Sequence, residues 1–268
     1  MQLSLFDNLL WGFGTALKLL LCFLVFYRGL HRRLPFFALY TVLLVAEVAI
    51  VWGVYRQWGF TSRAAWYTAW SALALVLLAR GLVVAELCRT SLRGYPAIWS
   101  LARKLLTFVA VVVVGYAAVI TVLRHTGRIA VFILTIERGL EMSIAAILVA
   151  LLAFGLRYRV ALGSVERNIA LGLGVYSAFQ VINNVFVEQW ISKYFHWWNS
   201  MRVVSFEIAM LLWIIPLRNP LLASGPSPVL AKPVLIDEQV ATSILGQLLD
   251  HMRAVRDEVK RLAKSFWR

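Results

Sequence analysis

Residues 128–154 read RIAVFILTIERGLEMSIAAILVALLAF, a stretch that is apolar almost throughout but carries charged residues near its centre. A membrane-spanning helix needs about 20 predominantly apolar residues, so this stretch is long enough to cross a bilayer. A charged side chain at the bilayer centre is costly and nearly always faces the protein interior or a water-filled cavity. The stretch therefore predicts a membrane helix that turns Glu137, Arg138 and Glu141 toward the inside of a bundle.

The rest of the chain repeats this pattern of apolar runs separated by charged residues, Pro or Gly. Of its 268 residues, 61% are hydrophobic, whereas soluble domains contain roughly 45–50%. Apolar runs of about 20 residues predict helices near residues 8–28, 36–57, 64–88, 98–123, 128–156, 166–188 and 198–218. The sequence thus predicts an all-α, polytopic membrane protein in which residues 1–218 form a bundle of seven transmembrane helices.

Lysine and arginine are distributed unevenly between the two ends of these helices. One side would hold 18 of them, counting the C-terminal tail, and the other side would hold six. Cytoplasmic loops of membrane proteins carry the excess of Lys and Arg. We therefore expect the N-terminus outside and the C-terminus in the cytoplasm, as in a multi-pass protein of a bacterial cytoplasmic (inner) membrane.

The net charge of +14 does not indicate nucleic-acid binding, because the basic residues stand at the ends of apolar segments rather than on a soluble domain. We expect them to set the topology and to contact membrane lipids. The chain contains no H-E-x-x-H motif, no P-loop and no G-x-S-x-G motif. We therefore expect no enzymatic activity, no metal and no cofactor, although a bound lipid is compatible with this composition.

Seven charged residues lie deep within the predicted helices and at similar depth. They are Lys18, Glu47, Arg80, Glu137, Arg138, Glu141 and Glu207. Four acids and three bases leave a formal balance of −1, which favours a mutually paired network with one carboxyl group in excess. Arg138 and Glu141, at i and i+3, can pair within one helix. A ligand- or signal-sensing cavity and a proton or ion pathway are the alternatives. Glu86 is expected near enough to the cytoplasmic end to be hydrated.

Beyond residue 218 the composition changes. Residues 219–236 hold four of the seven prolines together with Ser and Gly, which predicts a semi-rigid cytoplasmic linker. Residues 237–268 predict an amphipathic helix with a heptad seam. The seam consists of Leu245, Leu248, Met252, Val255, Val259, Leu262 and Phe266. This helix could form a coiled coil with a second copy or another subunit, lie on the inner leaflet, or fold back on the bundle. Its mixed charges favour a protein partner over lipid.

Four short stretches carry a resemblance: YRGLHRRLPFFALYTVL (27–43), YPAIWSLARKLL (95–106), IERGLEMS (136–143) and ALGLGVYSAF (170–179). Through them the chain resembles uncharacterised bacterial seven-helix integral membrane proteins. In plan it is more distantly similar to the seven-helix input domains of sensor kinases, which continue from the seventh helix into the cytoplasm. Residues 219–268 hold no ATP-binding domain, so the resemblance implies signal output through a separate partner.

Together these features predict a non-enzymatic membrane protein that acts as a sensory or accessory subunit. Its tail helix would dock a partner or a second copy, so we expect a homo-oligomer or a membrane complex. The alternative is a small proton- or ion-coupled transporter or channel that uses carboxyl groups such as Glu47 or Glu141. Against this alternative, no helix is clearly interrupted by Gly or Pro at mid-depth and no inverted repeat is visible.

Overall fold

A computed structural model describes residues 5–59, 62–123, 128–158, 163–190 and 195–218. The described part of the chain contains seven α-helices, one short 3-10 helix and no strand, which confirms the all-α prediction. The helices are α1 (Leu5–Tyr27), α2 (Pro35–Trp58), α3 (Arg63–Ser91), α4 (Pro96–Leu123), α5 (Arg128–Tyr158), α6 (Ser164–Trp190) and α7 (Phe195–Arg218), with the 3-10 turn at Leu30–Arg32. The predicted linker (219–236) and tail helix (237–268), with its seven seam residues, lie outside the described residues.

Local sequence explains where several of these helices begin and end. Gly29 and Gly59 adopt positive φ angles of 66° and 77°, a conformation that glycine adopts without steric cost, and each follows a helix end. Pro35 begins α2, and proline is favoured at the first helical position because its missing N–H is not needed there. Ser62 caps α3, since its hydroxyl accepts a hydrogen bond of 3.1 Å from the N–H of Ala65.

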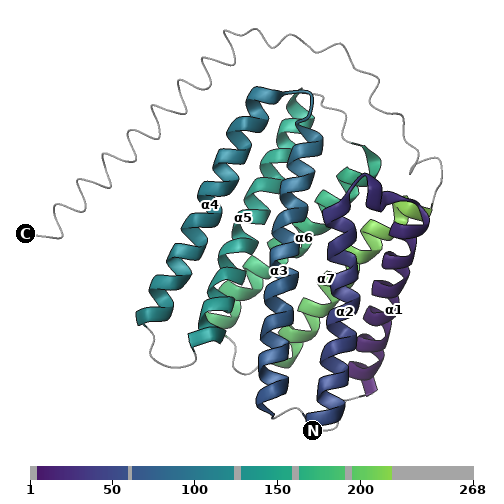
Figure 1. Cartoon of the computed structure of the whole chain (residues 1–268), viewed down its shortest axis with the longest axis vertical. Coiled ribbons are helices and arrows are strands. Elements are labelled where there is room, and N and C mark those ends of the chain that lie inside the picture. The colour runs from purple at the N-terminus through teal and green to yellow at the C-terminus, as the bar shows by residue number, and fades with distance from the viewer. Residues whose placement is uncertain (1–4, 60–61, 124–127, 159–162, 191–194, 219–268) are drawn as a thin grey trace, which may run out of the picture. The chain divides into compact units, whose positions relative to one another are not determined.

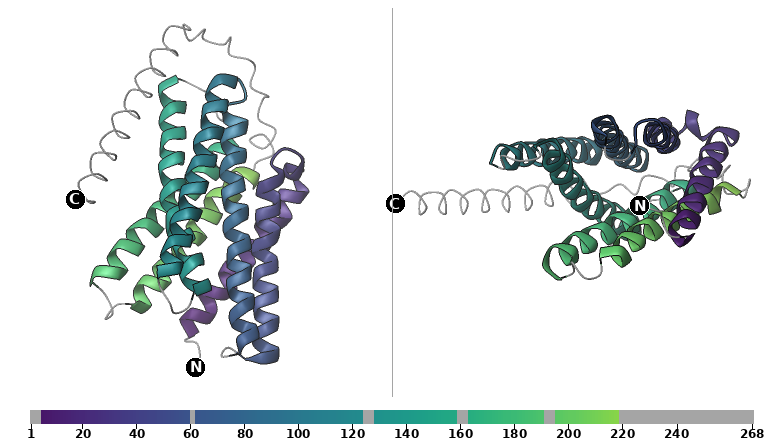
Figure 2. Two further views of the ribbon diagram at one scale, coloured as in Figure 1. Left: turned by 60° about the vertical axis from the view of Figure 1, so that its left-hand side comes forward. Right: turned by 90° about the horizontal axis from the view of Figure 1, so that it is seen from below.

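Six of the helices form a closed ring, as Figures 1 and 2 show. Around this ring α1 contacts α2, α2 contacts α3, α3 contacts α5, α5 contacts α6, α6 contacts α7, and α7 contacts α1. Helix α4 lies outside the ring and, among the described helices, contacts only α5 and α3. We call the end at which α1, α3, α5 and α7 begin the lower end, as it is drawn in Figure 1, and the opposite end the upper end.

Four helices are long and apolar enough to cross a membrane, which suggests a membrane protein. They are Leu9–Tyr27, Pro35–Trp58, Arg63–Ser91 and Ile98–Val122. Helix α4 shows this character most clearly, since Ala117 is the only buried side chain among its described ones. Helices α5, α6 and α7 are long enough as well, with 31, 27 and 24 residues, but they are not among the helices that are apolar enough.

Apolar side chains fill the upper half of the ring. Trp213 on α7 is at its centre, packed edge-on against Phe37 and Tyr40 of α2 with ring centroids 5.7 and 6.1 Å apart. Its indole N–H donates a hydrogen bond of 3.2 Å to the carbonyl of Ile169 on α6. Helices α6 and α7 can approach this closely because Gly172 has no side chain: a Cβ there would lie 2.3 Å from Nε1 of Trp213.

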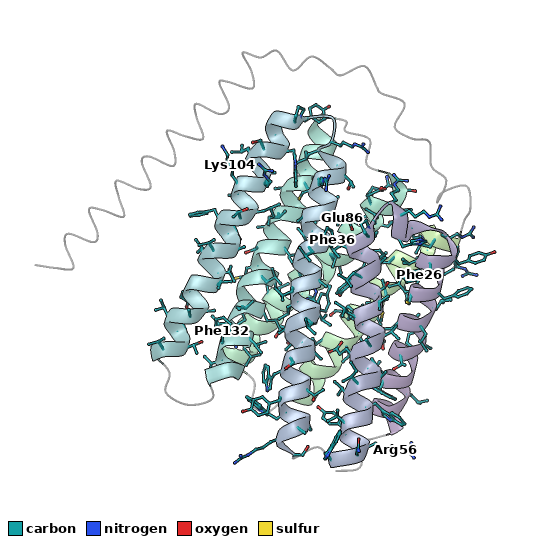
Figure 3. All side chains as sticks on the ribbon, in the orientation of Figure 1. Phe26, Phe36, Arg56, Glu86, Lys104 and Phe132 are labelled. Carbon is teal, nitrogen blue, oxygen red and sulfur yellow. The ribbon has the colours of Figure 1, made fainter. Side chains whose placement is uncertain are left out.

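Three polar contacts tie the upper end together. Glu86 of α3 accepts hydrogen bonds of 3.0 and 2.9 Å from the N–H groups of Phe36 and Phe37 in the first turn of α2, and Figure 3 shows Glu86 beside Phe36. Arg28 donates to the carbonyl groups of Leu217 and Arg218 at the end of α7. Arg33 pairs with Glu166 of α6 at 2.7 Å.

The contact made by Glu86 corrects the expectation that this side chain is hydrated. Leu34, which precedes α2, provides no side-chain cap, so the first N–H groups of that helix need another acceptor. The buried carboxyl group of Glu86 supplies it from the neighbouring helix. A negative charge at a helix N-terminus also interacts favourably with the helix dipole.

Candidate functional site: a charged cavity inside the helix ring

A cavity of about 230 Å³ lies in the lower half of the ring and is partly open. All six ring helices contribute to its wall. Its charged wall residues are Lys18, Glu47, Arg80, Glu137, Arg202 and Glu207. Five of the seven residues expected to form a deep charged network therefore line one cavity, and they come from α1, α2, α3, α5 and α7.

The remaining two predicted residues, Glu141 and Arg138, lie in different surroundings. Glu141 is fully buried, and its two carboxylate oxygens bind Arg80 of α3 and the hydroxyl of Ser177 of α6. Arg138 is exposed on α5. Glu141 therefore pairs across helices with Arg80, a contact that the i,i+3 spacing within α5 did not predict.

The Arg80–Glu141 pair closes the upper side of the cavity. Arg80 is 4% exposed and lines the cavity from α3, and the centre of its guanidinium group lies 4.8 Å from the centroid of the Tyr176 ring. The Tyr176 hydroxyl in turn accepts a hydrogen bond of 2.7 Å from Gln180. The buried guanidinium group of Arg80 is therefore held in place by its contacts with a carboxylate and an aromatic ring.

Above this pair the described part of the ring contains a dense apolar core. The most deeply buried members of this core include Leu21, Val83, Leu87, Ile144, Leu148, Leu173 and Met210. These residues follow the charged positions toward the upper end of their helices. Directly above the Arg80–Glu141 pair the cavity therefore meets mainly apolar side chains.

The acidic and basic groups around the cavity are neighbours but are not all paired. Lys18 lies within electrostatic range of Glu47, and its Nζ lies 5.8 Å from the centroid of the Phe206 ring. Arg202 of α7 is a basic neighbour of Glu137 of α5, and both line the cavity. Within the described residues neither of these couples closes to a direct salt bridge, in contrast to Arg80 and Glu141.

Glu207 is a buried acidic residue of this site, and one oxygen of its carboxyl group has no hydrogen-bond partner within the described residues. Its side chain is 6% exposed, and the oxygen concerned is Oε1. The carboxyl group lies against Gly14 of α1, where an added Cβ would be 3.1 Å from Oε1. A buried carboxyl group without a partner carries a desolvation cost. It is therefore a position that a ligand or a proton would satisfy.

Arg202 is the wall residue that sequence reasoning missed, since it was counted among the basic residues at the outer boundary. Helical spacing did not place it, because residues five apart point about 140° away from each other. The one signal available was the length of the arginine side chain, which can carry its charge well away from its own backbone position.

Comparison of the chain with protein-family models, with curated proteins and with solved structures found no match. The fold and the cavity thus define the class: an all-helical protein with several helices apolar enough for a membrane and a charged pocket inside its ring.

Proposed function

We propose that this chain is a seven-helix protein of the bacterial cytoplasmic membrane, with its N-terminus outside, that acts as a sensory or accessory subunit and catalyses no reaction. In this arrangement the cavity lies in the outer half of the membrane. The bundle would bind a ligand there and pass its state to a partner, or to a second copy, through residues 237–268.

The surface of the less apolar helices supports seven spans. Charged residues of α5 and α7 such as Glu137, Glu141 and Glu207 are buried or line the cavity. The exposed side chains along the middle of α5, α6 and α7 are apolar apart from Arg138 and Arg202. They include Leu134, Met142, Val149, Leu171, Val175, Ile182, Ile208, Leu211 and Ile215. An outward apolar face with inward charges is what a membrane bundle requires.

The single observation that carries the sensory function is the partly open cavity walled by charged groups from five helices. A ligand that pairs with these groups would favour one arrangement of the helices over another, because a ligand shifts a conformational equilibrium only through differential contacts. The closed upper side favours binding over conduction, since a conducting path needs polar groups across the whole membrane.

The test compares the assembly state of the full-length protein with that of two variants purified from native membranes. Deletion of 237–268 should remove the partner or second copy, measured as particle mass by native mass spectrometry. Glu207→Gln should change the fraction of assembled particles if the cavity is coupled to the tail. Unchanged assembly after the deletion overturns docking through the tail, and unchanged assembly in Glu207→Gln reduces the proposal to an accessory role.

A proton- or ion-coupled transporter is the second candidate, and the unpartnered carboxyl group of Glu207 is the observation that favours it. Proton flux into liposomes that contain the purified protein distinguishes the two functions. The sensory function predicts that liposomes with the protein show the same proton flux as liposomes without it. A flux that depends on the protein and is lost in Glu207→Gln would replace the sensory function with transport.

A further inference from the structure

A second cavity, also of about 230 Å³, lies between α1 and α2. Its walls are apolar except where they adjoin the charged cavity, and they include Leu19 on α1 with Val45, Val48, Ala49 and Trp52 on α2. Several of these side chains are well exposed, including those of Leu19 and Trp52. We call this cavity the α1–α2 groove, and α1 and α2 lie side by side at one edge of the ring (Figure 1).

The groove and the charged cavity adjoin each other. Trp11, Thr15 and Lys18 of α1 belong to the walls of both. An apolar groove on the outer surface of the ring therefore lies next to the charged cavity, with Lys18 between them. An apolar compartment beside a charged one matches an amphipathic molecule, with a hydrocarbon chain in the first and a polar head in the second.

The charges of the inner cavity indicate which head group it would accept. Arg80 is already neutralised by Glu141. The remaining wall charges are then two bases, Lys18 and Arg202, and three acids, Glu47, Glu137 and Glu207. A head that carries both charges could place an anion beside the bases and an amine beside Glu207, whose Oε1 has no partner within the described residues.

The size of the cavity agrees with a small zwitterionic head. A volume of 230 Å³ corresponds to about eight water molecules at ~30 Å³ each, which is enough for an ethanolamine phosphate. A primary amine has three N–H donors to offer to Glu207, whereas a quaternary amine has none.

We propose that this cavity binds the head of a zwitterionic lipid that carries a primary amine next to a phosphate. The amine lies at Glu207, the phosphate lies near Lys18 and Arg202, and one acyl chain occupies the α1–α2 groove. The inference rests on the proposed function and deepens it, since the lipid would be the ligand that the bundle senses.

The experiment measures lipid binding to the purified, delipidated full-length protein by native mass spectrometry. The probes are dioleoyl-phosphatidylethanolamine, the phosphatidylcholine and phosphatidylglycerol with the same chains, and soluble O-phosphoethanolamine. One charge-assisted contact, at roughly 1.5–3 kcal/mol, predicts about tenfold or greater preference for the ethanolamine lipid over the other two lipids. Equal or tighter binding of phosphatidylglycerol overturns the proposal.

Variants separate the head site from the groove. Glu207→Gln should abolish the preference for the ethanolamine lipid. Val48→Phe should fill the groove and weaken the binding of all three lipids. Val42→Phe, on the exposed face of α2 outside the groove, is the matched control and should leave lipid binding unchanged. Because Val48→Phe leaves the head site intact, it keeps the proposal falsifiable if Glu207→Gln fails to fold. Phosphoethanolamine that binds as tightly as the lipid, or lipid binding unaffected by Val48→Phe, overturns the role of the groove.

Lipid binding and assembly are independent readouts, so the two proposals can fail separately. If lipid binding is selective but Glu207→Gln leaves the assembly state unchanged, the lipid site is supported and the sensory coupling is overturned. An assembly state that responds to Glu207→Gln without selective lipid binding supports the sensory function and overturns the lipid.

Discussion

Arg80 on α3 and Glu141 on α5 form an ion pair whose side chains are 4% and 0% exposed. The pair joins two ring helices and, through the hydroxyl of Ser177, a third. It separates the charged cavity from the apolar core. Because both charges are removed from solvent, each is costly without the other, and the pair therefore holds these helices in one register.

Breaking this pair should destabilise the protein strongly. Glu141→Gln leaves the guanidinium group of Arg80 buried without a counter-charge, and loss of one partner of a buried pair costs about 3–5 kcal/mol. The measurement is the midpoint of thermal unfolding in detergent, followed by intrinsic tryptophan fluorescence. The double variant Arg80→Met/Glu141→Met should recover most of the loss, because it leaves no uncompensated charge. Arg103→Met on the exposed surface of α4 is the control and should change stability little. A midpoint that stays the same in Glu141→Gln would contradict the role of the pair.

The contact between Glu86 and the first turn of α2 makes a separate prediction. Glu86→Ala removes the acceptor for the N–H groups of Phe36 and Phe37, and loss of a helix cap costs about 0.5–2 kcal/mol. Hydrogen exchange at the start of α2, read by mass spectrometry, should increase locally. Thr90→Ser, one turn further along α3, keeps its hydroxyl and should leave exchange in α2 unaltered. Equal exchange in wild type and Glu86→Ala would show that the cap is unimportant.

Two glycine-to-alanine changes should have opposite effects. A Cβ at Gly172 would lie 2.3 Å from Nε1 of Trp213 and 3.0 Å from the carbonyl oxygen of Ala209, so Gly172→Ala must push α6 and α7 apart. Gly115 on α4 has no atom within 4 Å of its added Cβ, and alanine is favoured over glycine in a helix by roughly 0.5–1 kcal/mol. Thermal unfolding should therefore occur at a lower temperature for Gly172→Ala and at the same or a higher temperature for Gly115→Ala. A tolerated Gly172→Ala would contradict the close approach of α6 and α7.

Cysteine labelling in intact cells tests the proposed seven spans and their orientation. In a Cys22→Ala/Cys88→Ala background, a membrane-impermeant maleimide should label Arg56→Cys and leave Arg93→Cys unlabelled, because the excess of Lys and Arg places residue 93 inside. Arg167→Cys distinguishes seven spans from four. It is protected if α5 crosses the membrane, and it is labelled if α5 remains outside. Labelling of all three after the cells are opened is the control for accessibility.

The apolar runs and their charged boundaries were sufficient to locate the helices. Each predicted range ends close to the observed helix, as for 36–57 against Pro35–Trp58 and 128–156 against Arg128–Tyr158. This works because the signals are local: Pro35 begins a helix and Gly59 ends one through their own backbone preferences. The depth of Lys18, Glu47, Glu137 and Glu207 along their helices follows from the same counting, which is why they meet at one level.

Contacts between helices required the tertiary structure. Spacing offered Arg138 as the partner of Glu141, but both oxygens of Glu141 are held by other helices, and Arg202 joins the cavity although its position suggested the membrane boundary. Glu86 was expected in water and is instead the cap of a neighbouring helix. Periodicity describes one helix at a time, whereas these pairings depend on how helices are rotated and how closely they approach, as at Gly172 and Trp213. The sequence by itself determined the helices and the depth of their charges; the packing of the ring decided which charges pair and which, like Glu207, are left without a partner.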